Sequence, residues 1–140
     1  MGSEYVRIPS DINGVEIEFG EQVMASAMHP RLLEALFFCI KPDVVNGLLL
    51  QRIHISSAKT FSGTGRHLAG KAVDISRING IFIAHGYRIS PAITELADGI
   101  QKRFDQFEFR RENYGPAYQT YMGKAKPMDG YMDHIHLAVN

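Results

Sequence analysis

The sequence predicts an α+β fold: a small, mainly antiparallel sheet with helices packed on one of its faces. Short segments in which apolar and polar residues alternate, as they do in half-buried strands, are interspersed with segments of helical periodicity. Asn-Gly pairs at 13–14 and 79–80 stand between alternating segments and are typical of the tight turns of antiparallel hairpins. With 140 residues, the chain is expected to form a single domain over 1–140.

The predicted strands share an alternation of apolar and polar side chains. Between 48 and 57, Ile53 and Ile55 lie on one face, and His54 and Ser56 on the other. The same alternation predicts a hairpin within 5–19, a second hairpin whose arms are Ala72–Ile78 and 81–84, and a C-terminal strand over 135–139.

The predicted helices carry start and stop signals. From Glu21 the pattern is helical, and Pro30 suits the first turn of a new helix that ends before Pro42. Ser90, followed by a proline, is a typical helix start. The apolar residues after it recur on one stripe, formed by Ile93, Leu96, Ala97, Ile100 and Phe104. The polar segment 110–130, rich in Gly and Tyr, is expected to be a long loop, and loops of that length are usually functional or disordered.

The charges of the chain balance. Fifteen Lys and Arg stand against fifteen Asp and Glu, which gives a net charge of zero when the six histidines are neutral. A nucleic-acid-binding protein normally shows a basic excess or a basic stripe, so no nucleic-acid partner is expected. The apolar runs fall far short of the roughly 20 residues that span a bilayer, so no membrane insertion is expected. No secretory signal is visible at the N-terminus, and we expect a monomer.

One face of the predicted sheet carries candidate metal ligands. If the apolar side chains of the three longest strands face the core, then His54, Asp74, His134 and His136 share the opposite face. His67, at the end of a Gly-rich loop, can reach the same place. Neutral imidazole and carboxylate are good zinc ligands, and a catalytic zinc takes three protein ligands and a water. The sequence therefore predicts a zinc cleft on the face opposite the helices, although His-x-His alone is more typical of a solvated face.

The combined pattern is more specific than its parts. Residues 67–75 read His-Leu-Ala-Gly-Lys-Ala-Val-Asp-Ile, and residues 133–136 read Asp-His-Ile-His. This pattern resembles the LAS-type zinc metallopeptidases, a group that contains D-Ala-D-Ala metallopeptidases, phage L-alanyl-D-glutamate endolysins and the hedgehog signalling domain. The resemblance covers roughly residues 48–140.

The resemblance implies a role for each residue of the pattern. His67, Asp74 and His136 would hold zinc, and Asp133 would be the general base. His134 would contact a metal ligand or the transition state. The implied activity is hydrolysis of the stem peptide of bacterial peptidoglycan, at the L-Ala–D-Glu bond as in the phage endolysins. The enzyme would reach the cell wall through a holin, a virion or another assembly.

Some residues differ from those of the LAS-type group, or have the implied role only under a structural condition. Lys59 stands where the group often has Arg, and it is expected to contact a substrate carbonyl or carboxylate. Arg66 and the Tyr-rich segment 114–121 are further candidates for substrate specificity. Asp133 can act as the base only if it lies in a bend or bulge, because on an ideal strand it would face away from His136.

Three other functions fit parts of the pattern. A D-Ala-D-Ala carboxypeptidase would need a closed pocket for a terminal carboxylate, whereas an endopeptidase needs an open groove. A zinc-containing cell-wall-binding or signalling module would keep the metal without turnover. A non-haem iron oxygenase also uses two His and one carboxylate, but it usually places His and carboxylate two residues apart rather than seven. His29 and His85 are expected to have structural or surface roles.

Overall fold

A computed structural model describes residues 5–21, 23–59, 66–67 and 69–140. Within this part of the chain there are three helices, α1 (Pro30–Cys39), α2 (Ile83–Ile89) and α3 (Pro91–Phe104). The strands are β1 (Asp11–Ile12), β2 (Val15–Phe19), β3 (Val44–Val45), β4 (Leu48–Leu49), β5 (Arg52–Ser57), β6 (Ala72–Ile78), β7 (Ile81–Phe82), β8 (Arg110–Tyr114), β9 (Gln119–Tyr121), β10 (Lys124–Ala125) and β11 (Ile135–Val139).

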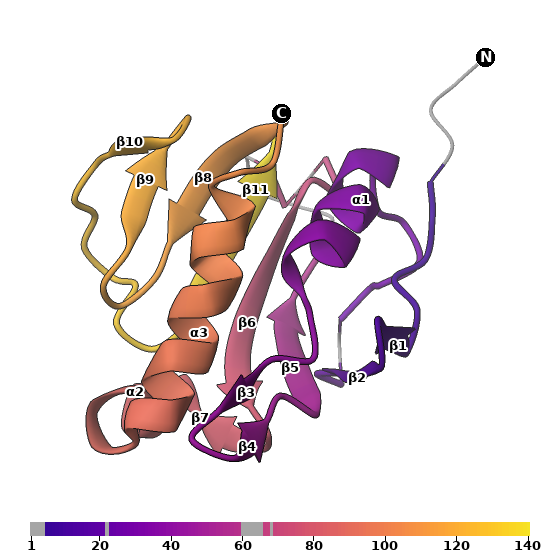
Figure 1. Cartoon of the computed structure of the whole chain (residues 1–140). Coiled ribbons are helices and arrows are strands. Elements are labelled where there is room, and N and C mark those ends of the chain that lie inside the picture. The colour runs from indigo at the N-terminus through magenta and orange to yellow at the C-terminus, as the bar shows by residue number, and fades with distance from the viewer. Residues whose placement is uncertain (1–4, 22, 60–65, 68) are drawn as a thin grey trace.

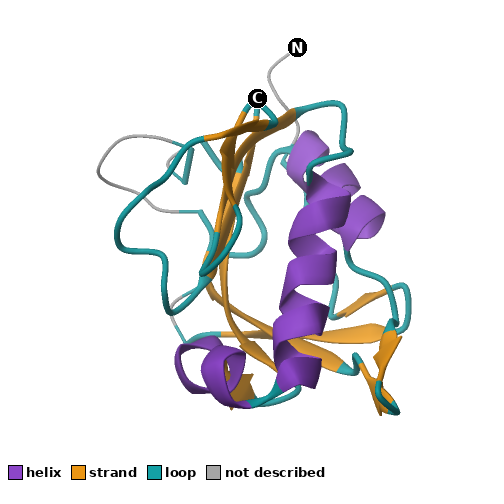
Figure 2. Cartoon of the chain, turned by 60° about the vertical axis from the view of Figure 1, so that its left-hand side comes forward, coloured by secondary structure: helices purple, strands orange, loops and turns teal. Residues whose placement is uncertain are grey.

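The described residues form one large sheet in the order β1-β2-β5-β6-β11-β8-β9-β10, and β7 pairs with β6 beside this path (Figure 1). The pair β2–β5 is parallel and the other pairs are antiparallel. Strands β3 and β4 form a separate small sheet. Helices α1 and α3 lie on one face of the large sheet (Figure 2), so the α+β architecture predicted from the sequence is confirmed.

The core lies between the sheet and these two helices. Its sheet side is built by alternating residues such as Ile55, Ile75 and Leu137, all fully buried. Helix α3 contributes the predicted stripe, since Ile93, Leu96, Ala97, Ile100 and Phe104 are all buried. The apolar residues that define the strands therefore also fix which face of the sheet is left for polar side chains.

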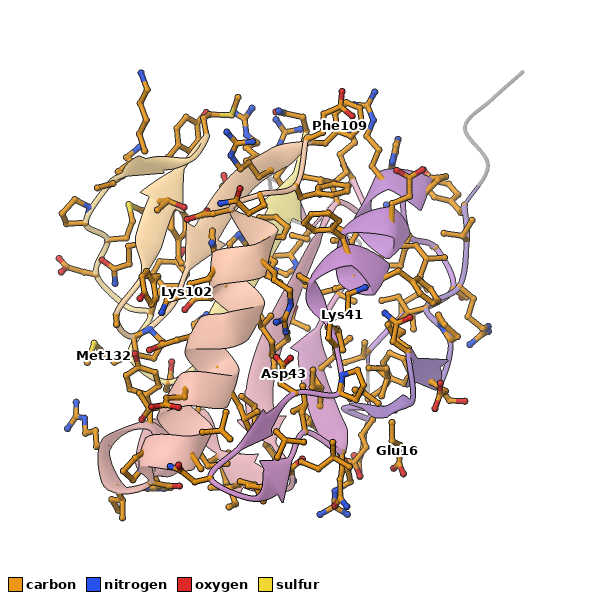
Figure 3. The ribbon with its side chains drawn as sticks, in the orientation of Figure 1. Glu16, Lys41, Asp43, Lys102, Phe109 and Met132 are labelled. Carbon is orange, nitrogen blue, oxygen red and sulfur yellow. The ribbon has the colours of Figure 1, made fainter. Side chains whose placement is uncertain are left out.

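Polar contacts at the helix ends fix how the helices sit. The Ser90 hydroxyl accepts a hydrogen bond from the Ile93 amide at the start of α3. At its other end, the Arg103 guanidinium pairs with Asp43, which lies beside α3 in Figure 3. The Arg31 guanidinium of α1 lies 4.0 Å from the centroid of the Phe109 ring, which Figure 3 labels near the end of that helix. These contacts hold both helices on the same side of the sheet.

The two Asn-Gly turns are confirmed. Asn13 and Gly14 have φ values of 55° and 88°, and Asn79 and Gly80 have values of 53° and 78°. Positive φ at both central positions is what a type I′ hairpin turn requires.

Several boundaries predicted from the sequence are wrong. The segment after Glu21 is not helical where it is described, and turns and isolated bridges precede α1. Strand β7 ends at Phe82 and α2 begins at Ile83, so the predicted strand over 81–84 is only half as long. The strand predicted over 48–57 is divided into β4 and β5. The loop predicted over 110–130 contains β8, β9 and β10, which extend the sheet beyond β11.

In the described part of the chain, no helix combines the length and the apolar character needed to cross a membrane.

Candidate metal centre

The residues of the predicted metal site meet on the sheet face away from α1 and α3. Asp74 on β6 and His136 on β11 are direct partners in the antiparallel register, so their side chains leave the sheet side by side. Nδ1 of His136 lies 2.8 Å from Oδ1 of Asp74. His67, which follows the Gly-rich loop, brings its Nε2 to 3.4 Å from the same carboxylate oxygen. Residues 60–65 and 68 of that loop lie outside the described residues.

These three residues form a group that can hold a metal ion, because one ligand atom from each lies within 4.8 Å of the other two. A tetrahedral zinc site with metal–ligand distances of about 2.0 Å has ligand atoms about 3.3 Å apart. The separations of 2.8 and 3.4 Å from the Asp74 oxygen bracket that value. The spacing of the group therefore fits a metal of this size.

The outer ring nitrogens of both histidines are hydrogen-bonded, which is a second feature of metal-binding histidines. Nδ1 of His67 lies 2.7 Å from the carbonyl oxygen of Ala58. Nε2 of His136 lies 2.8 Å from Oε1 of Glu112, on β8. If each of these acceptors takes the single N–H of a neutral ring, His67 presents an unprotonated Nε2 and His136 an unprotonated Nδ1 to a metal ion. Both unprotonated nitrogens face Asp74.

The charges in the group are strongly coupled. Burial lowers the pKa of His136, but its hydrogen bonds to Asp74 and Glu112 outweigh burial and raise the pKa to about 9. Burial also lowers the pKa of His67, and contact with Asp74 more than reverses this shift. For Asp74, burial raises the pKa, but the two imidazoles together hold it well below its usual range. The hydrogen bond from His136 likewise lowers the pKa of Glu112. A proton and a metal ion therefore compete for the same nitrogens.

Asp133 lies in a bend immediately before β11, with 68% of its side chain exposed, so it does not point into the core. The condition that residue 133 lies in a bend is therefore met, and its role as the base stays a prediction. Its Oδ1 lies 2.7 Å from Nδ1 of His134, and this hydrogen bond lowers the pKa of Asp133, while the nearby charge of Asp74 acts in the opposite direction. The Asp133 carboxylate is ionised at neutral pH, and His134 holds it in place.

Two tyrosines form an aromatic wall beside the group. The ring of Tyr114, the β8 partner of His136, stacks on His136 with centroids 5.7 Å apart and planes 14° apart. Tyr131 lies against Tyr114, His134 and His136, with centroid distances of 5.0, 5.2 and 5.9 Å. This wall explains why His136 is only 8% exposed although it stands on the polar face of β11.

The other candidates lie in different positions. His54 is paired with Arg77 on β6, whereas Asp74 is paired with Ser57, so His54 does not join the metal group. The Lys59 ammonium lies 5.5 Å from the centroid of the Tyr5 ring, and its contact with substrate stays a prediction.

Arg66, His29 and His85 lie outside the three proposed ligands. Arg66 precedes His67 and is close enough to contribute to lowering the pKa of Glu112. His29 caps α1, and His85 is exposed on α2, as expected for structural and surface residues.

Nothing in the sequence indicated Glu112, and Tyr114 was indicated only as part of the Tyr-rich segment 114–121, because both residues lie in the segment predicted as a loop. The alternation of Glu112 and Tyr114 with Arg111 and Asn113 is the only trace of β8 in the sequence. Asn113, the core-facing residue between them, is polar and buried, and it forms hydrogen bonds with Gln101. A strand with polar residues on both faces gives no apolar signal.

The cleft predicted around the zinc stays a prediction. A pocket of about 420 Å³ is lined by Arg7, by the end of β2 and by the segment after β2, and no lining residue belongs to the metal group. Besides Arg7, the lining residues are Phe19, Glu21, Val23, Met24, Ala25 and Ser26.

Comparisons of the chain with protein-family models, curated proteins and solved structures found no significant match in any of the three. The resemblance to the LAS-type group therefore stays a prediction that rests on the residues of the sequence pattern.

Proposed function

We propose that the protein is a zinc-dependent peptidase that hydrolyses the stem peptide of bacterial peptidoglycan, at the L-Ala–D-Glu bond. The observation that carries the proposal is the meeting of His67, Asp74 and His136, with Asp133 in a bend three residues before the last of them. The side chains of these three residues support zinc as the metal, because two imidazoles and one carboxylate are the ligands of many catalytic zinc sites. The bond and the substrate class come from the resemblance to the LAS-type group.

The roles of the side chains follow from their positions. His67 and His136 would hold zinc through Nε2 and Nδ1, and Asp74 through Oδ1. Zinc bound there supplies a Lewis acid for the scissile carbonyl and lowers the pKa of its water to about 7.

Proton transfer is assigned to Asp133, which lies outside the three proposed ligands. Asp133 is ionised and exposed, so it is able to accept a proton from the attacking water and deliver it to the leaving amine. His134 fixes the orientation of that carboxylate through the 2.7 Å hydrogen bond.

Metal analysis separates the proposal from an iron oxygenase. The purified protein is stripped with a chelator and offered zinc or ferrous iron, and the bound metal is counted per chain. One zinc per chain, lost in His67→Ala and His136→Ala, supports the proposal. Selective retention of iron, or failure to bind zinc, contradicts it.

A cleavage assay then separates an enzyme from a binding module. Zinc-loaded wild type, Asp133→Asn and Asp129→Asn are incubated with purified peptidoglycan, and new amino groups are followed over time. Asp129 is exposed in the same connection before β11, so its variant makes the same chemical change away from the metal group. We expect Asp133→Asn to lower the rate by about 10²- to 10⁴-fold, the usual contribution of a general base, and Asp129→Asn to leave it unchanged. Intact peptidoglycan after incubation with zinc-loaded wild type would contradict the proposal.

A further inference from the structure

Glu112 is the one acidic side chain outside the three proposed ligands that touches the metal group in the described residues. It lies on β8 opposite Ala138 of β11, and Ala138 is in turn opposite Ala72 of β6. Both alanines are fully buried and offer only a methyl group. On the β11 side of its row the longer Glu112 side chain therefore meets no bulky neighbour, whereas its partner on β9 is Tyr121. It reaches diagonally to His136, two positions along β11.

His136 is held between two carboxylates, one at each ring nitrogen. Asp74 lies 2.8 Å from Nδ1, and Glu112 lies 2.8 Å from Nε2. The two nitrogens of an imidazole point away from each other in the ring plane. An ion bound at Nδ1 together with Asp74 and His67 is therefore out of reach of Glu112, so Glu112 is not a fourth ligand of that ion.

The identity of the bound nitrogen depends on where the ring carries its proton. A neutral imidazole has one N–H, and the nitrogen without it is the one that binds metal. Both carboxylates beside His136 only accept hydrogen bonds, but Asp74 would be a ligand of the bound ion, so Glu112 is the one left to accept the single N–H. With the ion bound, Glu112 therefore favours the tautomer with the proton on Nε2. That tautomer leaves Nδ1 unprotonated on the side of Asp74 and His67.

At His67, a backbone carbonyl rather than a side chain fixes which ring nitrogen carries the proton. Its outer nitrogen is held by the backbone carbonyl of Ala58, at 2.7 Å, which no substitution of a single side chain removes. At His136 the task falls to Glu112, whose side chain is 24% exposed and is open to mutation. The two histidines can therefore be tested separately.

We propose that Glu112 is a positioning residue that holds His136 in the Nε2-protonated form and so makes Nδ1 the metal-binding nitrogen. The proposal rests on the proposed zinc site, but it does not depend on the reaction catalysed there. Outer hydrogen-bond partners of metal-binding histidines typically contribute 10- to 100-fold to metal affinity.

The first test needs no variant. The wild-type chain, labelled with ¹⁵N and loaded with ¹¹³Cd, is studied by NMR, in which scalar coupling identifies each nitrogen bound to the metal. We expect coupling to Nδ1 of His136 and to Nε2 of His67, and a proton on Nε2 of His136. Coupling to Nε2 of His136, or no binding of cadmium to His136, would overturn the proposal.

The second test measures zinc affinity by competition with a chromogenic chelator. Glu112→Gln keeps the size and an acceptor oxygen but loses the charge, and we expect about 10-fold weaker zinc binding, with up to about 100-fold for Glu112→Ala. Glu108→Gln is the matched control, because Glu108 is exposed four residues earlier and outside β8, and its affinity should equal that of wild type. Wild-type affinity in both Glu112 variants would overturn the proposal.

The two proposals fail in different ways. If the Glu112 variants bind zinc weakly but the wild type leaves peptidoglycan intact, the positioning role stands and the peptidase function fails. If the wild type cleaves peptidoglycan and the Glu112 variants bind zinc as tightly as it does, only the positioning role fails.

Discussion

Nδ1 of His136 lies 2.8 Å from Oδ1 of Asp74, although the two residues are 62 positions apart in the chain. They meet because β6 and β11 are neighbours and these residues are direct register partners. The same carboxylate oxygen also faces Nε2 of His67. One acidic group on a central strand therefore orients both imidazoles, and its removal has the most direct consequences.

Asp74→Asn is expected to abolish tight zinc binding and to destabilise the metal-free protein. The neutral amide cannot match the carboxylate as a partner for the imidazoles, and hydrogen bonds to charged groups are worth about 1.5–3 kcal/mol. Urea unfolding in the presence of a chelator should show a loss of this size in the free energy of unfolding. Asp129→Asn is the control, and an Asp74→Asn variant as stable as this control would contradict the account.

The stability of the metal-free protein should fall as the pH rises from 6.5 to about 9. The folded-state pKa of His136, about 9, is above its ordinary value of 6.5, so the stabilisation is complete below pH 6.5 and is lost as the pH rises through 9. The pKa values of Asp74 and Glu112 are lowered, so their contribution is present above their ordinary values of 3.8 and 4.5 and is lost in acid. Stability should therefore be greatest between about pH 5 and 6.5.

Urea unfolding at pH 5.5, 7 and 9 with a chelator measures this dependence. His136→Gln should flatten the alkaline side of the profile, because it removes the titrating ring. A wild-type profile that is flat or rises from pH 6.5 to 9 would contradict the proposed coupling.

Zinc binding near pH 7 should release protons. Metal ligands must be deprotonated, and the imidazole of His136 carries a proton at this pH in the metal-free protein. Calorimetric titration with zinc, repeated in buffers of different ionisation enthalpy, gives the number of protons released. We expect at least about one per zinc at pH 7 and fewer at pH 9. Equal release at both pH values would show that His136 is not the competing site.

Gly70→Ala should weaken both stability and zinc binding. Gly70 has a φ of +71°, and a Cβ at this position would lie 2.5 Å from the carbonyl oxygen of Ala27. Its carbonyl also accepts the hydrogen bond from the His29 amide, and its amide donates to the carbonyl of His67. The left-handed backbone alone costs an alanine about 1–2 kcal/mol, and the clash with backbone adds to this.

The control for that substitution is Gly14→Ala. Gly14 has a φ of +88°, and a Cβ added to it would meet nothing within 4 Å, so its variant carries the backbone cost without the clash. Thermal unfolding should place Gly70→Ala below Gly14→Ala, and only Gly70→Ala should lose zinc affinity. If the two substitutions had equal effects on the unfolding temperature and on zinc affinity, the close approach of Gly70 to Ala27 would have no role in forming the metal site.

Local signals made much of the fold predictable. The Asn79-Gly80 turn, the Ser90 cap and the alternation in β6 each depend on residues that are close in the sequence, and each is found in the structure. Helix α2 was missed because it is only seven residues long, contains Gly86 and has no side-chain cap. Strand β8 was missed because its core-facing Asn113 is polar, and its burial depends on Gln101 in another element.

The candidate site was predictable in part for the same reason. Alternation places Asp74 and His136 on one face, and the family pattern adds His67 to them. Alternation does not show how far apart two residues of one face lie along neighbouring strands. The register of β5 and β6 places His54 opposite Arg77, away from Asp74. Glu112 could not be recognised as a partner of His136 before β8 was known to pair with β11.

Mass spectrometry of purified peptidoglycan exposed to the zinc-loaded protein tests the proposed peptidase activity, because it identifies the residue at each new amino terminus. We expect new N-terminal D-Glu, which is absent when the protein is treated with a chelator and returns when zinc is restored. Release of free D-Ala instead would identify a carboxypeptidase. Peptidoglycan with no new termini, after exposure to protein that carries one zinc per chain, would contradict the assignment as a peptidase.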